Sequence, residues 1–212
     1  KNQATPSASV GKTSNSVPEK EQTTHISILD KEGNAISITT TLNGYYGSKT
    51  VVSGAGFLLN NEMDDFSIIP GVPNLYGAIG GEANAIAPKK RMLSSMTPTI
   101  ILKDGKTFMV VGTPGGTTIP TSVYQAITGV IDFKLPPTLV INQPRFHHQW
   151  LPEKIFIEKY FPKTTINTLS EKKYTFEERS NIGKLELILM DEKGNIIAIA
   201  DRREADSVGV EE

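Results

Sequence analysis

Hydrophobic and polar residues alternate with a period of two along three stretches of the chain, and a short polar turn interrupts each stretch. Such alternation is typical of β-strands, and two strands joined by a short turn form a hairpin. The three expected pairs of strands are residues 25–30 with 35–39, 100–103 with 106–111, and 185–190 with 196–200. Three hairpins predict a substantial antiparallel sheet.

A helical period replaces this alternation between residues 118 and 132. Five apolar residues there have the spacing i, i+3, i+4, i+7 and i+8 and form one face: Val123, Ala126, Ile127, Val130 and Ile131. The sequence therefore predicts an amphipathic helix that packs on the sheet. Gly129 lies within it at a cost of about 1 kcal/mol relative to alanine, which indicates close packing at that position. A second helix is expected at residues 165–173.

Two segments have no period. Residues 1–22 contain four apolar side chains among polar residues and prolines, too few to offset the entropy lost on ordering. We therefore expect a tail or linker that ends at Gln22. Residues 70–81 are interrupted by Pro and Gly and are expected to form a surface loop, of a length that often serves as a lid.

Composition narrows the function classes. The 22 Lys and Arg and the 23 Asp and Glu give a net charge of −1, which offers no electrostatic support to a nucleic-acid or membrane partner. The sequence has no cysteine, and this excludes disulfides, thiolate zinc sites and a cysteine nucleophile. No apolar run approaches the roughly 18 residues that a membrane-spanning helix needs.

Histidine offers little for a metal site, because the chain has three in all. His147 and His148 are adjacent, and adjacent side chains in an extended chain point to opposite sides. They cannot chelate one ion together, so we expect this region to have a packing role. The sequence predicts no metal and no cofactor.

Thr23 stands at the abrupt change from the polar segment to the first apolar strand. One interpretation is a polar linker that enters an edge strand. The other is an amino-terminal nucleophile: once the bond between Gln22 and Thr23 is cut, the hydroxyl attacks a carbonyl and the new α-amino group acts as its base. An α-amino group has a pKa of about 7.7 to 8.0, so roughly a tenth of it is neutral at pH 7.

The neighbours of Thr23 bear on this choice. Thr41 and Asn43 lie at the end of the partner strand, and hairpin pairing brings the Thr41 hydroxyl near Thr23, although threonine is also common in strands. Ser94 and Ser95 offer hydroxyls that can bind a carboxylate. Singly, each of these signals is weak.

Three carboxylates follow an apolar run: Glu62, Asp64 and Asp65. Acidic turns of this kind are usually solvated. Their alternative role is to accept hydrogen bonds from a substrate ammonium, an interaction stronger than a neutral contact. They would then recognise an amino-acid headgroup.

Gly115 and Gly116 lie between the strand that ends at Val111 and the helix that begins near Ile119. Backbone amides at a helix start favour an anion. A phosphate-binding loop would need a Gly-Lys-Ser/Thr ending or a Gly-x-Gly-x-x-Gly pattern, and the sequence has neither. An oxyanion hole built from the two glycine amides suits a threonine nucleophile better.

Read in order, these motifs closely resemble the small subunit of bacterial γ-glutamyltransferases, from Thr23 to the end of the chain. The resemblance is carried by Thr23-Thr24-His25, Thr41-Leu42-Asn43, residues 60–66, residues 90–96, Pro114-Gly115-Gly116 and residues 144–147. Six motifs in the right order are specific for the family. The resemblance implies an α+β fold of the N-terminal nucleophile hydrolase type, a four-layer αββα sandwich in which residues 23–212 are the small-subunit part.

The resemblance also implies a role for each site residue. The catalytic group would be the nucleophile Thr23, its orienting partner Thr41, and the oxyanion hole of Gly115 and Gly116. The donor would be held at its α-amino group by Asn43, Glu62 and Asp65, and at its α-carboxylate by Ser94 and Ser95. Residues 70–81 would form a lid gated by Tyr76, which favours small donors over long polymers.

The implied reaction is γ-glutamyl transfer from glutathione-type donors to water, amino acids or peptides through an ester on Thr23, after autoproteolysis before that residue. The implied partner is the large subunit of the same precursor, which contributes an arginine and whose carboxyl end residues 1–22 resemble. Export to the periplasm or cell exterior is also implied. Thr118 stands where many relatives have an arginine, and Met92 where a proline is usual, departures that bear on acceptor preference more than on the nucleophile.

Three alternatives remain open. The chain resembles relatives of other γ-acyl specificity, namely poly-γ-glutamate depolymerases and glutaryl-cephalosporin acylases. Glu62 and Asp65 oppose the acylase, because a glutaryl group has no ammonium to pair with them. The third alternative is a catalytically inert partner subunit in which Thr23 stays acylated by Gln22.

Overall fold

The first expected hairpin consists of β1 (Thr23–Leu29) and β2 (Ala35–Thr41) in the computed structural model, which describes residues 23–191, 193–203 and 208–210. Its open end extends two residues further than the alternation predicted, on both strands. The antiparallel register sets Thr23 opposite Thr41. The expected tail at residues 1–22 lies outside the described residues.

The other two hairpins join in one four-stranded antiparallel sheet. Its strands are β3 (Thr99–Lys103), β4 (Lys106–Gly112), β8 (Glu186–Met190) and β9 (Ile196–Ala200), in the spatial order β3-β4-β8-β9. Pairing of β4 with β8 unites the two hairpins, which lie far apart in the sequence. The buried side chains of Met109, Val111, Leu187 and Leu189 on these central strands form part of the hydrophobic core.

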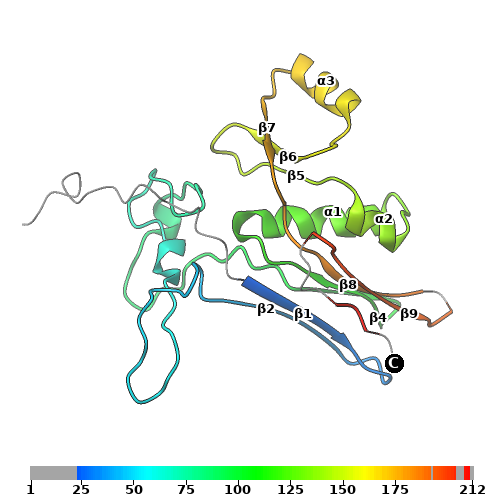
Figure 1. Ribbon diagram of the computed structural model, residues 1–212, viewed down its shortest axis with the longest axis horizontal. Coiled ribbons are helices and arrows are strands. Elements are labelled where there is room, and N and C mark those ends of the chain that lie inside the picture. The colour runs from blue at the N-terminus through cyan, green and yellow to red at the C-terminus, as the bar shows by residue number, and fades with distance from the viewer. Residues whose placement is uncertain (1–22, 192, 204–207, 211–212) are drawn as a thin grey trace, which may run out of the picture.

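Two helices cover one face of this sheet (Figure 1). They are α1 (Ile119–Ile131) and α2 (Pro137–Asn142), and α1 buries the face that its spacing predicts, including Val123, Ala126 and Val130. A Cβ on Gly129 would lie 3.1 Å from Cγ2 of Val140 on α2. Glycine at that position therefore permits close helix packing, as its place in the pattern indicated.

The β1–β2 hairpin packs on the opposite face of the sheet, against β4 and β8. Helices, sheet and hairpin form three successive layers (Figure 1), and the expected α+β class is confirmed. The hairpin turns a mainly polar face toward the sheet, where His25 is buried, and its isoleucines outward. Its outward isoleucines are 46–52% exposed: Ile26, Ile28, Ile36 and Ile38.

A third, three-stranded sheet projects from these layers and was not predicted (Figure 1). It consists of β5 (Phe146–His147), β6 (Ile155–Glu158) and β7 (Phe176–Arg179), with β6 and β7 parallel. The crossover between them contains α3 (Lys163–Glu171), two residues earlier than expected. Lys173, with φ +69°, adopts a left-handed conformation that ends the helix.

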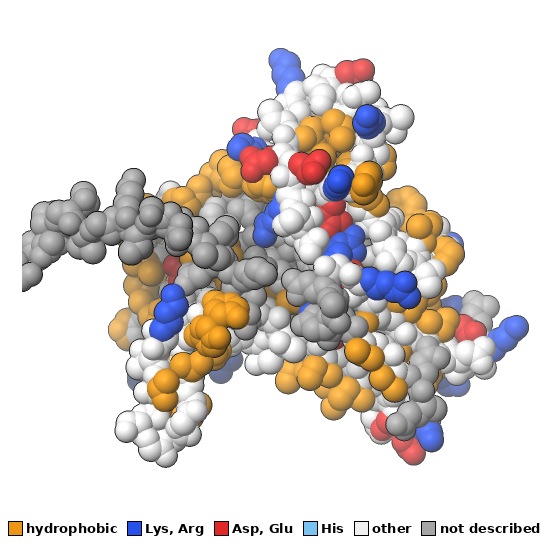
Figure 2. All heavy atoms as spheres, viewed as in Figure 1, with side chains coloured by type: hydrophobic (Ala, Val, Ile, Leu, Met, Phe, Trp, Pro, Cys, Tyr) orange, Lys and Arg blue, Asp and Glu red, His pale blue; other side chains and the backbone are white. Residues whose placement is uncertain are grey.

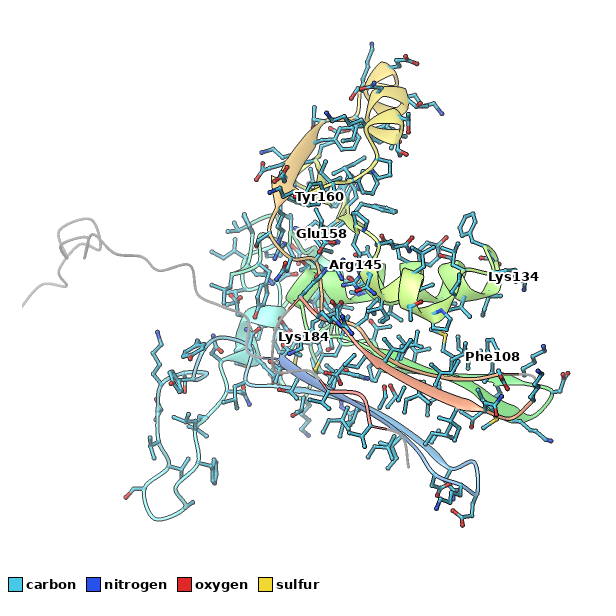
Figure 3. The ribbon with its side chains drawn as sticks, turned by 45° about the vertical axis from the view of Figure 1, so that its right-hand side comes forward. Phe108, Lys134, Arg145, Glu158, Tyr160 and Lys184 are labelled. Carbon is cyan, nitrogen blue, oxygen red and sulfur yellow. The ribbon has the colours of Figure 1, made fainter. Side chains whose placement is uncertain are left out.

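A buried ion network attaches the C-terminal strand region to this sheet. Arg145 is 1% exposed and donates to Asp201 Oδ2 at 2.6 Å, while Arg203 donates to Glu158 Oε2 at 2.6 Å and to Asp201 Oδ1 at 3.0 Å. Burial alone would raise the pKa of Asp201 and of Glu158. Both pKa values nevertheless lie below their usual range, because both guanidinium groups act on Asp201, while Arg203 and the backbone N–H groups of Ile182 and Arg145 act on Glu158. Arg145 and Glu158 lie near one another beside α1 (Figure 3).

Candidate active site

A cleft with a volume of about 110 Å³ opens at the end of the hairpin where β1 begins and β2 ends. Eight of the ten predicted site residues line it: Thr23, Thr41, Asn43, Asp65, Tyr76, Ser94, Ser95 and Gly116. Of the other two, Gly115 is buried next to Gly116, and Glu62 does not line the cleft. The structure therefore brings the predicted residues together, while their roles stay predictions.

The register of the hairpin places the two threonine hydroxyls together. Thr23 Oγ1 lies 3.1 Å from Thr41 Oγ1, which also accepts the backbone N–H of Asn43 at 2.8 Å. Asn43 is buried with φ +73°, a left-handed conformation that asparagine tolerates. The chain turns sharply there, so the Asn43 side chain stays beside the cleft.

The acidic turn is the 3₁₀ helix η2 (Glu62–Asp65). Burial, together with repulsion from Glu62 and Asp64, raises the pKa of Asp65 to about 6. Burial also raises the pKa of Glu62. No ion pair to these carboxylates occurs among the described residues. The negative charge at Asp65, which lines the cleft, is therefore not compensated by any described residue, and this suits a cationic ligand.

The predicted lid, residues 70–81, closes over one side of the cleft. Its neck is held by a hydrogen bond from Gly71 N to Gly80 O at 2.9 Å. Tyr76 Oη donates to Asn43 O at 2.8 Å, and Leu75 N donates to Asp64 Oδ2 at 2.9 Å. These contacts tie the loop across the cleft to the hairpin side and to the acidic turn.

Asn84 is a lining residue that the sequence analysis missed. It belongs to the 3₁₀ helix η3 (Glu82–Asn84), and its Nδ2 donates to Asp65 O at 2.7 Å while its Oδ1 accepts Leu93 N at 2.9 Å. Asn84 thus fixes the acidic turn relative to the serine pair. A single asparagine in an irregular loop gives no pattern by which to find it.

The paired glycines open the 3₁₀ helix η4 (Gly116–Thr118), which leads directly into α1. Gly115 has φ +140° and Gly116 φ +52°, conformations that glycine adopts without steric cost. No hydrogen bond to the N–H of either glycine occurs within the described residues. These amides remain available as donors, as an oxyanion hole requires.

His25 joins the strand of Thr23 to the strand that precedes the glycine loop. It is 2% exposed, its ring nitrogens contact Thr39 Oγ1 at 2.8 Å and Ser27 Oγ at 3.0 Å, and burial lowers its pKa to about 4. A Cβ on Gly112 would lie 2.0 Å from the His25 ring. The imidazole is neutral near pH 7 and packs directly on the Gly112 backbone, which sets the spacing of β1 and β4.

His147 has a packing role, in agreement with the sequence interpretation. It is buried, contacts Thr121 Oγ1 and Gln149 Oε1 at 2.8 Å each, and stacks on Phe156. The described residues contain no cluster of three His, Cys, Asp or Glu side chains that would hold a metal ion. No helix in the described ranges combines the length and apolarity needed to cross a membrane.

Comparison with known proteins bears on the family. The sequence profile of the family described as Gamma-glutamyltranspeptidase matches residues 1–210. The chain is 44% identical to the glutathione hydrolase proenzyme of Escherichia coli over 98% of this chain and 36% of that protein. It is 50% identical to the glutathione hydrolase proenzyme of Pseudomonas aeruginosa over 82% of this chain and 32% of that protein. The chain thus spans about a third of the length of these two curated relatives.

Solved structures extend the comparison to the fold. The T380A mutant of Helicobacter pylori gamma-glutamyltranspeptidase is similar with a TM-score of 0.80 at 48% identity, covering 85% of this chain and all of that one. The transpeptidase CapD of Bacillus anthracis gives a TM-score of 0.65 at 25% identity, over 89% of this chain and 99% of that one. These structures confirm the N-terminal nucleophile hydrolase assignment. The chain belongs to the gamma-glutamyltranspeptidase family.

Proposed function

We propose that this chain carries the nucleophile and most of the donor site of an enzyme that transfers the γ-glutamyl group of glutathione-type donors to water, amino acids or peptides. The observation that carries the proposal is the shared cleft. Thr23 Oγ1 lies 3.1 Å from Thr41 Oγ1 there, and the same cleft is lined by Asp65 and Gly116. A hydroxyl nucleophile, a cation acceptor and a backbone donor thus surround one small volume.

The chemistry requires one residue to supply both nucleophile and base. The Thr23 hydroxyl attacks the γ-carbonyl of the donor and gives its proton to the α-amino group of Thr23. The tetrahedral oxyanion accepts hydrogen bonds from the N–H groups of Gly115 and Gly116. The tetrahedral adduct then collapses, the C–N bond breaks, and the leaving amine takes the proton. Water or an acceptor amine attacks the resulting ester and releases Thr23.

Asp65 supports a γ-glutamyl donor over a glutaryl one. Its carboxylate is partly buried and has no cationic partner among the described residues. Burial of a carboxylate without a cationic partner costs free energy. The α-ammonium of a γ-glutamyl group would offset that cost through a charge-assisted hydrogen bond, whereas a glutaryl group has no ammonium. The bond from Tyr76 Oη to Asn43 O closes the cleft on one side, which favours short donors over a long polymer.

We also propose that this chain acts with a large subunit cut from the same precursor. The chain spans about a third of its curated relatives. Its hairpin exposes Ile26 and Ile28 on β1 and the two facing isoleucines of β2, and a contiguous apolar face of this kind is typical of an interface. Export to the periplasm or cell exterior stays a prediction, which cell fractionation would test.

Maturation would use the same hydroxyl. Thr23 Oγ1 attacks the carbonyl of Gln22, the acyl group shifts from nitrogen to oxygen, and water hydrolyses the ester. The products are a carboxylate at Gln22 and a free amine on Thr23. Mass spectrometry of the expressed precursor would then show a new amino terminus at Thr23.

The test is Thr23→Ala in the full precursor, with Thr24→Ala as matched control because Thr24 is exposed on the same strand. We expect Thr23→Ala to abolish self-cleavage and release of a γ-glutamyl anilide, while Thr24→Ala does both normally. Turnover by Thr23→Ala at the wild-type rate would refute the nucleophile. An uncut wild-type chain without hydrolysis would favour the inert partner subunit instead.

A further inference from the structure

The two amides of the proposed oxyanion hole belong to two consecutive peptide units. The Gly115 N–H is part of the Pro114–Gly115 peptide, and the Gly116 N–H is part of the Gly115–Gly116 peptide. Each unit carries its carbonyl on the side opposite to its N–H, because a trans peptide is planar. Whatever holds the two carbonyls therefore determines where both N–H groups point.

A threonine hydroxyl holds each of these carbonyls. Thr113 Oγ1 donates to Pro114 O at 2.6 Å, and Thr118 Oγ1 donates to Gly115 O at 2.7 Å. The backbone N–H of Thr118 donates to the same Gly115 oxygen at 3.0 Å. The exposed fractions of Thr113 and Thr118 are 0% and 1%, so neither hydroxyl exchanges its partner with bulk water.

The two bonds from the Thr113 and Thr118 hydroxyls form a clamp on the glycine loop. This clamp is anchored beside the four-stranded sheet. Thr113 Oγ1 also accepts the N–H of Lys184 at 2.6 Å, just before β8 begins (Figure 3). A Cβ on Gly115 would lie 2.5 Å from Thr118 Oγ1 and 3.2 Å from Gly183 Cα. The loop is therefore seated against the segment that leads into β8, and there is no room to shift Gly115 toward it.

Glycine needs such a clamp more than other residues do. Without a Cβ, the peptide units on both sides of Gly115 can rotate at little steric cost. An oxyanion hole is effective only when its donors are already aimed at the position of the developing charge. Two buried hydroxyls that fix the carbonyl ends supply that preorganisation from the side away from the cleft.

We propose that Thr113 and Thr118 are positioning residues of the oxyanion hole, which fix the direction of the Gly115 and Gly116 N–H groups by holding the carbonyls of the same two peptide units. The inference rests on the proposed function and extends it. It also gives a role to Thr118, which departs from the family pattern. Neither Thr113 nor Thr118 lines the cleft, so substrate binding in the ground state should not depend on their hydroxyls.

The first experiment compares Thr118→Val, which keeps the shape and removes the hydroxyl, with Thr118→Ser, which keeps the hydroxyl. The matched control is Thr128→Val, which removes a half-buried hydroxyl that donates to Tyr124 O within α1. All variants are assayed as the full two-subunit protein, with rates normalised to the mature fraction found by mass spectrometry. We expect kcat of Thr118→Val to fall roughly 10- to 100-fold with KM within about twofold, because only transition-state stabilisation is lost.

The same variants separate a positioning role from a general structural one. A boronic acid analogue of glutamate, which forms a tetrahedral adduct on Thr23, should bind Thr118→Val more weakly by the same factor as kcat falls, while L-glutamate binds as before. Thr118→Ser should restore both values. An unchanged kcat in Thr118→Val, or a serine variant as impaired as the valine variant, would overturn the inference.

Crystal structures decide the inference independently of activity. In Thr118→Val the Gly115–Gly116 peptide should rotate and turn the Gly116 N–H away from the cleft, whereas in Thr128→Val it should not. If the wild-type protein proves inactive, the proposed function fails. The orientation of the Gly115–Gly116 peptide in the crystal structures would still show whether the Thr118 hydroxyl holds it in place. A Gly115 carbonyl that keeps its direction without the hydroxyl would contradict the proposal. Thr113→Val provides the second variant, with the Pro114–Gly115 peptide as its readout.

Discussion

The chain buries carboxylates in two regions and treats them in opposite ways. In the ion network, Asp201 and Glu158 each contact a guanidinium group, which keeps their pKa values below the usual range despite burial. In the acidic turn, Asp65 has other carboxylates as its charged neighbours, and its pKa is raised to about 6. The first region uses charge to hold the fold, whereas in the second no cation of the described residues compensates Asp65, which leaves it available to the proposed donor.

Arg145→Met should break the network most severely. The side chain is 1% exposed and its guanidinium contacts Asp201 at 2.6 Å, so its removal leaves part of a buried charge uncompensated. Loss of one partner of a buried ion pair costs about 3 to 5 kcal/mol. Urea unfolding of the full two-subunit protein would measure this as a fall in the free energy of unfolding.

The matched control for this change is Lys154→Met. Lys154 also forms an ion pair, at 2.7 Å from Glu177, but its side chain is 48% exposed. Exposed pairs contribute about 0 to 1 kcal/mol. Equal effects at Arg145 and Lys154 would show that burial does not distinguish the network.

Asp65→Asn should lower kcat/KM for the donor but raise the stability of the fold. Loss of a charge-assisted contact to the donor ammonium costs about 1.5 to 3 kcal/mol, which lowers kcat/KM roughly 10- to 150-fold. The folded state of the apo protein binds the Asp65 proton more tightly than the unfolded state, so the ionised carboxylate destabilises the fold at pH 7. Because Asp65 is only half-buried, we expect Asp65→Asn to raise the free energy of unfolding by about 1 kcal/mol after allowing for screening.

Enzyme assays and urea unfolding at pH 7 would measure both effects. Asp104→Asn makes the same chemical change in an exposed turn and serves as the control. Asp65→Asn with unchanged kcat/KM would show that this carboxylate does not bind the donor. A loss of stability would show that its charge is compensated after all.

The raised pKa of Asp65 also predicts a pH dependence. Below about pH 6 the carboxyl group is protonated and neutral, while the donor ammonium keeps its charge. KM should therefore rise about tenfold for each pH unit below 6, and Asp65→Asn should lack this rise. Initial rates at varied donor concentration between pH 4.5 and 8 would show it, and a parallel rise in the variant would assign the titration to another group.

The sequence predicted one end of the cleft from a local pattern and the rest of it from the family resemblance, whereas it gave no sign of the ion network. The period-two pattern around one turn fixes the register that sets Thr23 opposite Thr41. The contacts of Arg145 with Glu158 and Asp201 join segments with no common period, so no local pattern predicts them. The same holds for the sheet of β5, β6 and β7, in which one strand has two residues and one pairing is parallel.

Two further features of the structure could not be predicted from the hydrophobic pattern, for a different reason. Alternation shows that a strand has two faces but does not say which face meets the sheet, and in the β1–β2 hairpin the polar face does. The hydroxyls of Thr113 and Thr118 flank the paired glycines in the sequence. Their direction toward the Pro114 and Gly115 carbonyls depends on side-chain torsions that a sequence does not specify.

The smallest predicted effect is that of substitutions at Asp64. These substitutions test whether Asp64 and its neighbour Asp65 have different roles in the same turn. Asp64 Oδ2 accepts the N–H of Leu75 at 2.9 Å and thereby ties the lid to the acidic turn. Asp64→Ala removes this bond, worth about 0.5 to 1.5 kcal/mol, and should raise KM about two- to tenfold with little change in kcat.

Asp64→Asn keeps an oxygen acceptor and should stay close to the wild type, in contrast to Asp65→Asn. Steady-state kinetics of the three variants at pH 8 would measure this order, because the carboxyl group of Asp65 is ionised there. If Asp64→Asn were impaired as strongly as Asp65→Asn, charge rather than lid attachment would be the property of Asp64 that matters, and the two acids would form one cation site.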